Sequence, residues 1–183
     1  MHHKNFKVLN VLDQYVIPLK GLKEGKSIFS FKVDNQFFEH FGNPEIGNGN
    51  LLADFVLNKT LSLIEMEISI SGELEVACDR CLESFFLPTN TKNKLFVKIG
   101  DGIKEEDAEI IYVSDFGQLL NIAQYIFEYI DFGIPLKKIH PNDENGNSLC
   151  NKQMLEKINE LSKKQSINGT DPRWDGLSEL RGK

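Results

Sequence analysis

The sequence predicts an α+β fold, in which a mainly antiparallel β meander or partly closed barrel is followed by two C-terminal helices and an extended tail. Three patterns support this prediction: a long alternation of apolar and polar residues, helical spacing of apolar residues after residue 118, and a polar composition after Lys164. We therefore expect a single folded domain over residues 1–164 and a polar C-terminal tail over residues 165–183.

The alternation begins after Leu61. Apolar residues occupy the even positions and glutamate or serine the odd ones, and only Gly72 interrupts the apolar face. The apolar positions are Ile64, Met66, Ile68, Ile70, Leu74 and Val76. A period of two is typical of a strand with one buried and one solvent-exposed face, which antiparallel sheets tolerate. We expect one long, bent strand here.

Shorter strands are expected on both sides of this one, because β-branched and aromatic residues gather between turn-forming residues. They cover residues 15–18, 28–33, 51–57, 95–99 and 110–113, the last of them as an edge strand. Residues 35–41 read as a single helical turn with aromatic side chains to bury. Residues 42–50 are rich in Gly, Asn and Pro and are expected to form a loop.

Two amphipathic helices are expected after the strands. Apolar residues recur every three or four positions from Leu119 to Ile130, and Gly133 and Pro135 should end this helix. Its apolar stripe should cover the sheet. The second, shorter helix carries Met154, Leu155, Ile158 and Leu161.

The charge balance bears on the class of partner. The net charge is −6, which disfavours a protein that holds RNA by charge alone, because phosphate neutralisation needs Lys and Arg. Residues 1–131 carry 12 basic and 20 acidic side chains, whereas residues 132–183 carry 9 and 7. The C-terminal third is therefore the better candidate for an RNA-binding face. No apolar run resembles a membrane span or a secretory signal, so we expect a cytoplasmic protein.

Cys78 and Cys81 lie where the long strand should end. Two cysteines separated by two residues can direct both sulfurs to one point, which is half of a tetrahedral zinc site. His140 and Cys150 would complete a set of three Cys and one His, and the implied cofactor is one structural zinc ion. Without a metal, Cys150 would be a buried residue at a helix start and His140 an exposed one.

Catalytic alternatives have less support in the sequence. A redox Cys-x-x-Cys needs a helix start within a βαβ unit, and no such unit surrounds Cys78 and Cys81. A Cys–His pair formed by His140 with Cys81 or Cys150 lacks a third orienting motif. The sequence shows no phosphate-binding glycine loop. We therefore expect a protein that is not an enzyme, and a thiol-dependent enzyme is the catalytic alternative.

The candidates for RNA or partner binding lie in the C-terminal third. They are Lys137, Lys138, Arg173, Trp174 and Arg181. Trp174 is the only tryptophan of the chain and follows an arginine that can pair with phosphate or stack. The alternatives are that Lys137 and Lys138 belong to a solvated loop and that Trp174 anchors the tail to the sheet.

Three segments together carry a resemblance to a known family. They are Ser71–Glu83 with its Cys-Asp-Arg-Cys-Leu-Glu motif, Ile126–Tyr129 leading into Ile134-Pro135, and Asp171-Pro172-Arg173-Trp174 with Leu177 and Leu180. In their order and approximate spacing these segments resemble the YceD family. The resemblance implies a non-enzymatic role in the accumulation of large-subunit ribosomal RNA. The implied partner is that RNA or a precursor ribosomal particle, bound directly or through a protein, without a membrane or a small-molecule substrate. A second hypothesis is a zinc-stabilised protein-interaction module that does not touch RNA.

Overall fold

The computed structural model describes residues 11–99, 109–114 and 119–165. The chain divides into two compact units. Unit 1 comprises Met1–Ala77 and Ser84–Lys138, and unit 2 comprises Cys78–Glu83 and Ile139–Lys183. The single folded domain over residues 1–164 stays a prediction.

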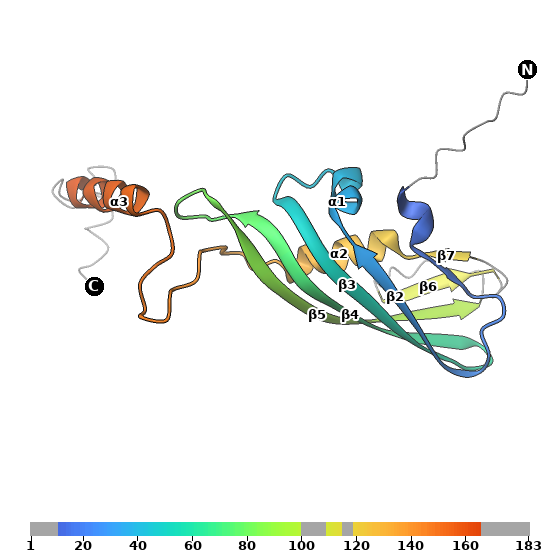
Figure 1. Cartoon of the computed structure of the whole chain (residues 1–183). Coiled ribbons are helices and arrows are strands. Elements are labelled where there is room, and N and C mark those ends of the chain that lie inside the picture. The colour runs from blue at the N-terminus through green and yellow to red at the C-terminus, as the bar shows by residue number, and fades with distance from the viewer. Residues whose placement is uncertain (1–10, 100–108, 115–118, 166–183) are drawn as a thin grey trace, which may run out of the picture. The chain divides into compact units, whose positions relative to one another are not determined.

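Unit 1 contains a five-stranded sheet in the order β2-β3-β4-β5-β6 (Figure 1). Its strands are β2 (Gly25–Val33), β3 (Ile46–Lys59), β4 (Leu63–Ala77), β5 (Ser84–Ile99) and β6 (Ile110–Val113). The first four form an antiparallel meander, and β6 pairs in parallel with the end of β5. β1 (Val16–Pro18) and β7 (Leu119–Asn121) form a separate two-stranded sheet. The predicted α+β class is confirmed, with a meander and no closed barrel among the described strands.

β4 confirms the predicted long strand. The even-numbered apolar side chains from Ile64 to Val76 are at most 1% exposed, and the polar side chains between them point to the other face. Gly72 has a φ of +149° and pairs with Leu51 of β3. A Cβ at this position would lie 2.7 Å from the Cα of Leu51, so only glycine fits where the two backbones approach.

The first helix, α1 (Asn35–Phe41), agrees with the expected aromatic turn. The Asp34 side chain accepts a hydrogen bond from the Gln36 N–H at its start, and Phe37 and Phe38 are buried. The loop predicted over residues 42–50 is too long, because β3 already begins at Ile46. Ile46 pairs with Val76 of β4 and is 5% exposed, so sheet pairing and burial outweigh the local turn preference.

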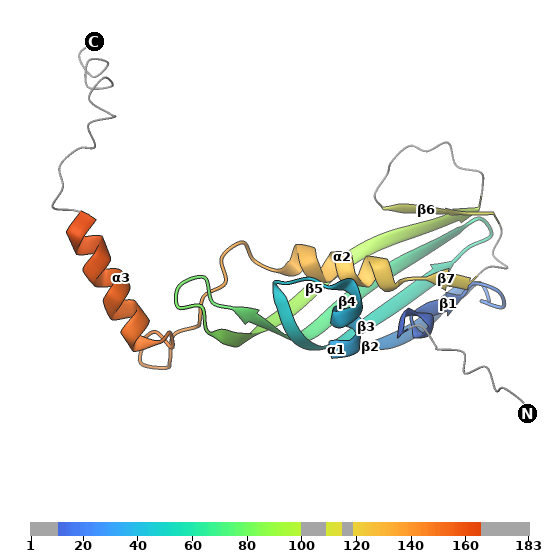
Figure 2. The ribbon, with the colours of Figure 1, turned by 90° about the horizontal axis from the view of Figure 1, so that it is seen from above.

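The predicted start of the next helix is also wrong. α2 (Ala123–Gly133) begins four residues after Leu119, because residues 119–121 pair with β1 instead. The Asn121 side chain then accepts a hydrogen bond from the Ala123 N–H. Ile126 and Ile130 are buried in the core cluster, and α2 packs against β5 (Figure 2). The predicted role of its stripe in covering the sheet is confirmed.

The expectation that the second C-terminal helix is the shorter one is wrong, because α3 (Lys152–Gln165) has 14 residues and α2 has 11. η1 (Val11–Gln14) is a 3-10 turn before β1, and α3 follows the last candidate ligand in unit 2. In the part of the chain that the structure describes, no helix is both long and apolar enough to cross a membrane. The predicted tail, apart from Gln165 at the end of α3, lies outside the described residues.

Candidate metal centre

The first half of the site is the turn that joins β4 to β5, residues 78–83. The N–H of Cys78 donates to the Glu83 carbonyl, and the N–H of Leu82 donates to the Cys78 carbonyl, both at 2.9 Å. Leu82 takes a left-handed φ of +64° to close the turn. As a result, the Cys78 and Cys81 side chains are both buried, at 0% and 3% exposure.

The second half is the segment from Ile139 to Cys150, which folds back on itself. Oδ1 of Asp143 accepts hydrogen bonds from the N–H groups of Asn145 and Asn147, and Oδ2 accepts one from the Asn147 side chain. The Asn147 side-chain bond is the main reason that the pKa of Asp143 lies below its usual value. The closed loop brings the two ends of the segment together, although nine residues separate His140 from Cys150.

Four donor atoms meet at one place in unit 2. The ligand atoms of Cys78, Cys81, His140 and Cys150 all lie within 4.8 Å of one another. Cys78 Sγ lies 3.7 Å from Cys150 Sγ, and Cys81 Sγ lies 3.4 Å from His140 Nδ1. A tetrahedral zinc ion holds two sulfurs about 3.8 Å apart and a sulfur and a nitrogen about 3.6 Å apart, as follows from its bond lengths of about 2.3 and 2.1 Å. The donor set suits zinc, and these two distances agree with tetrahedral coordination.

The thiols are reduced, and the pKa of the Cys78 thiol is shifted from its usual value. A disulfide joins its sulfurs at about 2.05 Å, far shorter than the 3.7 Å found between Cys78 and Cys150. Burial raises the pKa of Cys78, but N–H groups of the Cys81, His140 and Arg80 backbone and the His140 side chain lower it to about 6. The thiolate, which is the form that binds metals, is thus favoured at this position at neutral pH.

Neighbouring polar groups hold the two halves together. Asn151 follows the candidate ligand Cys150 and caps α3, because its Oδ1 accepts a hydrogen bond from the Met154 N–H at 3.2 Å. Its Nδ2 donates to Glu83 Oε1 at 2.6 Å, so the same side chain reaches the turn that carries the other cysteines. Neither Asn151 nor Glu83 was predicted from the sequence as part of the site. An asparagine just before an apolar helical pattern is a recognisable N-cap signal, whereas nothing in the sequence points to Glu83 as its partner.

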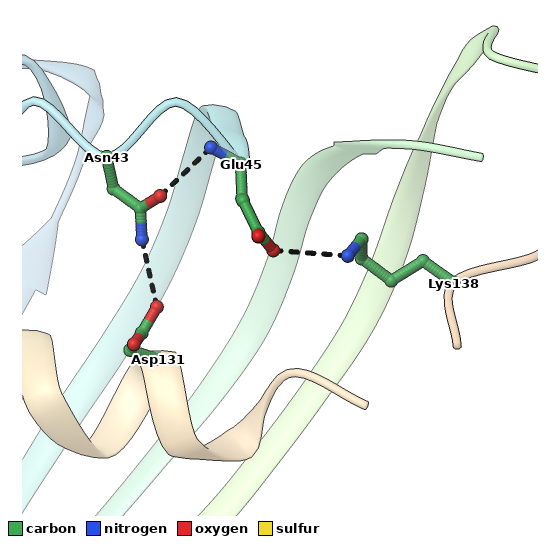
Figure 3. A network of polar contacts seen from close by, with 4 residues as sticks. All are labelled: Asn43, Glu45, Asp131 and Lys138. Atoms are coloured by element: carbon green, nitrogen blue, oxygen red, sulfur yellow. Dashed lines mark hydrogen bonds and ion pairs between the residues drawn. The ribbon is translucent and has the colours of Figure 1, made fainter. Parts of the chain in front are cut away.

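Of the predicted binding residues, only two lie in the described part of the chain. Lys137 is exposed. Lys138 has a side chain that is 13% exposed, and its Nζ lies 3.1 Å from Glu45 Oε2 (Figure 3). Asn43 extends this network by donating to Asp131 and accepting from the Glu45 N–H, both at 2.9 Å. The ammonium group of Lys138 is therefore already engaged within unit 1.

The other three predicted binding residues are Arg173, Trp174 and Arg181, and they lie outside the described residues. The structure accordingly brings together all four candidate metal ligands. Contact of the five predicted binding residues with RNA or a protein stays a prediction.

Comparisons with known proteins give one match. No curated protein and no solved structure matches the chain. A family model described as "Large ribosomal RNA subunit accumulation protein YceD" matches residues 66–181, which is more than half of the chain. The matched region contains all four candidate ligands and the Asp-Pro-Arg-Trp motif. The chain therefore belongs to the YceD family.

Proposed function

We propose that this protein is a non-enzymatic cytoplasmic factor that supports accumulation of large-subunit ribosomal RNA, and that one structural zinc ion organises its second unit. The observation that carries the proposal is the family match over residues 66–181, which gives the chain a ribosome-related role. The site adds a physical reason for the Cys-Asp-Arg-Cys-Leu-Glu motif, since two of its residues belong to the cluster of four donors.

The zinc ion would act as the cross-link of unit 2. Its ligands come from two segments, the 78–83 turn and residues 139–151, that have little apolar core of their own. Small units of this kind commonly take their folding free energy from a metal, and removal of that metal unfolds them.

The donor set supports a structural role rather than a catalytic one. A catalytic zinc site has three protein ligands and one position open to water or substrate, whereas structural sites are closed by four protein ligands. Here Cys78, Cys81, His140 and Cys150 supply four donors, and the three cysteines are at most 3% exposed. A thiol enzyme would instead need a cysteine that substrate can reach.

The charge of unit 2 favours contact with the ribosomal particle through a protein. In the described part of unit 2, the numbers of basic and acidic residues are nearly equal. They are Arg80, Lys152, Lys157, Lys163 and Lys164 against Asp79, Glu83, Asp143, Glu144, Glu156 and Glu160. RNA binding depends on a local excess of positive charge. This balance is the specific observation in favour of the second candidate, a protein-interaction module that does not touch RNA.

Sucrose-gradient fractionation of a deletion strain tests the proposed function. We expect fewer large subunits and an accumulation of precursors, restored by the wild-type gene but not by one encoding Cys78→Ser and Cys150→Ser. Glu144→Gln, an exposed change in the loop between the ligands, is the matched control and should complement. A normal profile in the deletion strain at low and optimal temperature would refute the proposal.

Ribonuclease treatment before pull-down separates the two candidates. An association with ribosomal proteins that survives digestion indicates a protein interface. An association that is lost indicates contact through RNA.

A further inference from the structure

Strand β5 has one open edge over residues 84–95. β4 pairs with β5 along its whole length, but β6 pairs with the other side of β5 only over residues 96–99 (Figure 2). No other described strand pairs with that side. An open edge presents backbone N–H and C=O groups to which an extended chain can add as a further strand.

The backbone groups at this edge belong to the even-numbered residues of β5. The Phe96 N–H donates to the Glu109 carbonyl beside β6 and so points away from β4. This direction alternates along a strand, and the register with β4 runs without a shift. The N–H groups of Asn90, Lys92 and Lys94 therefore also point to the open edge, where no described strand accepts them.

The side chains along the edge favour an acidic occupant. Residues 84–99 carry three lysines and no acidic residue. The ammonium group of Lys94 lies 3.0 Å from Glu65 Oε1, whereas Lys92 is exposed and forms no ion pair with a described residue. Pairing with the same edge of a second copy would place like charges side by side, and Pro88 offers no N–H to it.

The opposite face of β5 carries polar atoms without partners. Oγ1 of Thr91 and Nδ2 of Asn93 are buried and have no hydrogen-bond partner among the described residues. α2 lies over this face, because a Cβ at Gly133 would clash with the Thr91 side chain. A buried polar atom without a partner is costly. Side chains of a strand added beside β5 would lie about 5 Å away, within reach of hydroxyl groups.

We infer that the open edge of β5 binds an extended acidic segment of a partner protein, which adds to the sheet as a strand. Its backbone pairs with residues 90–94. Its carboxylates lie on the face of Lys92 and Lys94, and its alternate side chains lie beside Thr91 and Asn93. The inference goes beyond the proposed function, because it concerns unit 1 and requires neither zinc nor RNA.

Amide hydrogen exchange, resolved by NMR in the full-length protein, tests the inference. In the free protein, the N–H groups of Thr91 and Asn93 face β4 and should exchange slowly, whereas those of Asn90, Lys92 and Lys94 should exchange fast. The probe is the peptide acetyl-Glu-Thr-Glu-Thr-Glu-Thr-Glu-amide, which alternates carboxylates and hydroxyls. At millimolar concentration it should slow exchange of the three edge amides about tenfold or more.

Two controls test the role of charge. A peptide with lysine in place of each glutamate should leave the edge amides unprotected. Lys92→Glu should weaken binding of the acidic peptide about fivefold, because an attractive cross-strand pair becomes a repulsive one. Lys26→Glu makes the same charge change at an exposed position of β2, the other edge strand of the sheet, and should leave the affinity unchanged.

Four results would overturn the inference. Edge amides that are protected in the free protein at every concentration would show that the chain itself covers β5. Protection that appears only at high protein concentration would identify a second copy as the occupant. Unchanged exchange with the acidic peptide would show that the edge does not accept such a strand, and equal protection by both peptides would show that charge does not select it.

Discussion

Asn151 is predicted to couple the metal site to α3, and its replacement should weaken both. Asn151→Ala removes the acceptor for the Met154 N–H and the donor to Glu83. Loss of an N-cap costs about 1 kcal/mol. Loss of the hydrogen bond to an exposed carboxylate costs roughly 1 kcal/mol, at the low end for charged groups. The sum is about 2 kcal/mol, which corresponds to about 30-fold in an equilibrium constant.

The assay for Asn151 is zinc affinity, measured by competition with a chromogenic chelator, together with hydrogen exchange of α3. We expect Asn151→Ala to bind zinc about 30-fold more weakly, within the range found for residues that hold metal ligands in place. Asn151→Asp keeps the capping oxygen, so α3 should stay protected while zinc affinity falls. Glu83→Ala should lower zinc affinity alone.

The double variant decides whether Asn151 and Glu83 act through one another. If their hydrogen bond carries the coupling, Asn151→Ala with Glu83→Ala should bind zinc no more weakly than Asn151→Ala alone. Wild-type zinc affinity in Asn151→Ala, or strict additivity in the double variant, would refute this reasoning.

Two further predictions concern unit 1. Gly72→Ala should lower the free energy of unfolding by about 2–5 kcal/mol, because its Cβ would meet the β3 backbone at a φ of +149°. Gly47→Ala is the control and should unfold near the wild-type denaturant midpoint, since its Cβ meets only ordinary contacts at 3.5 Å or more. Equal midpoints for the two variants would contradict this prediction. Lys138→Gln should lower the free energy of unfolding by less than about 1 kcal/mol, as expected for a partly exposed ion pair with Glu45. It should also reduce co-sedimentation with ribosomal particles less than Lys137→Gln does. The reverse order would show that Lys138 binds the partner despite its ion pair with Glu45.

Much of the fold was predictable because the strongest pattern in the sequence, the alternation of apolar and polar residues, arises within a single strand. The alternation along β4 follows from one face being buried and the other wet, and Gly72 was visible as its interruption. The wrong predictions of secondary structure arose where pairing with a strand distant in the sequence decides the structure. Residues 119–121 continue a helical pattern, yet they form β7 because β1 offers a strand partner about 100 residues earlier in the sequence. Ile46 joins β3 for a similar reason.

The four residues of the candidate site were predictable from the sequence, but the side chains that support them were not. Cys78 and Cys81 share a short spacing, which predicts convergence. The closeness of His140 and Cys150 depends on a loop held by Asp143. The Asp, Asn and Gly residues of this loop predict a turn, but they do not specify where the chain goes after it. The bond from Asn151 to Glu83 joins residues 68 positions apart, which composition and spacing do not reveal.

Zinc content tests the central claim most directly. Elemental analysis of untagged protein, purified without added metal, should find about one zinc ion per chain, and Cys78→Ser or Cys150→Ser should lose it, while the Glu144→Gln protein keeps it. Removal of the metal by a chelator should abolish hydrogen-exchange protection in residues 139–163. A folded wild-type protein without zinc, or zinc that stays bound when both cysteines are replaced, would contradict the account.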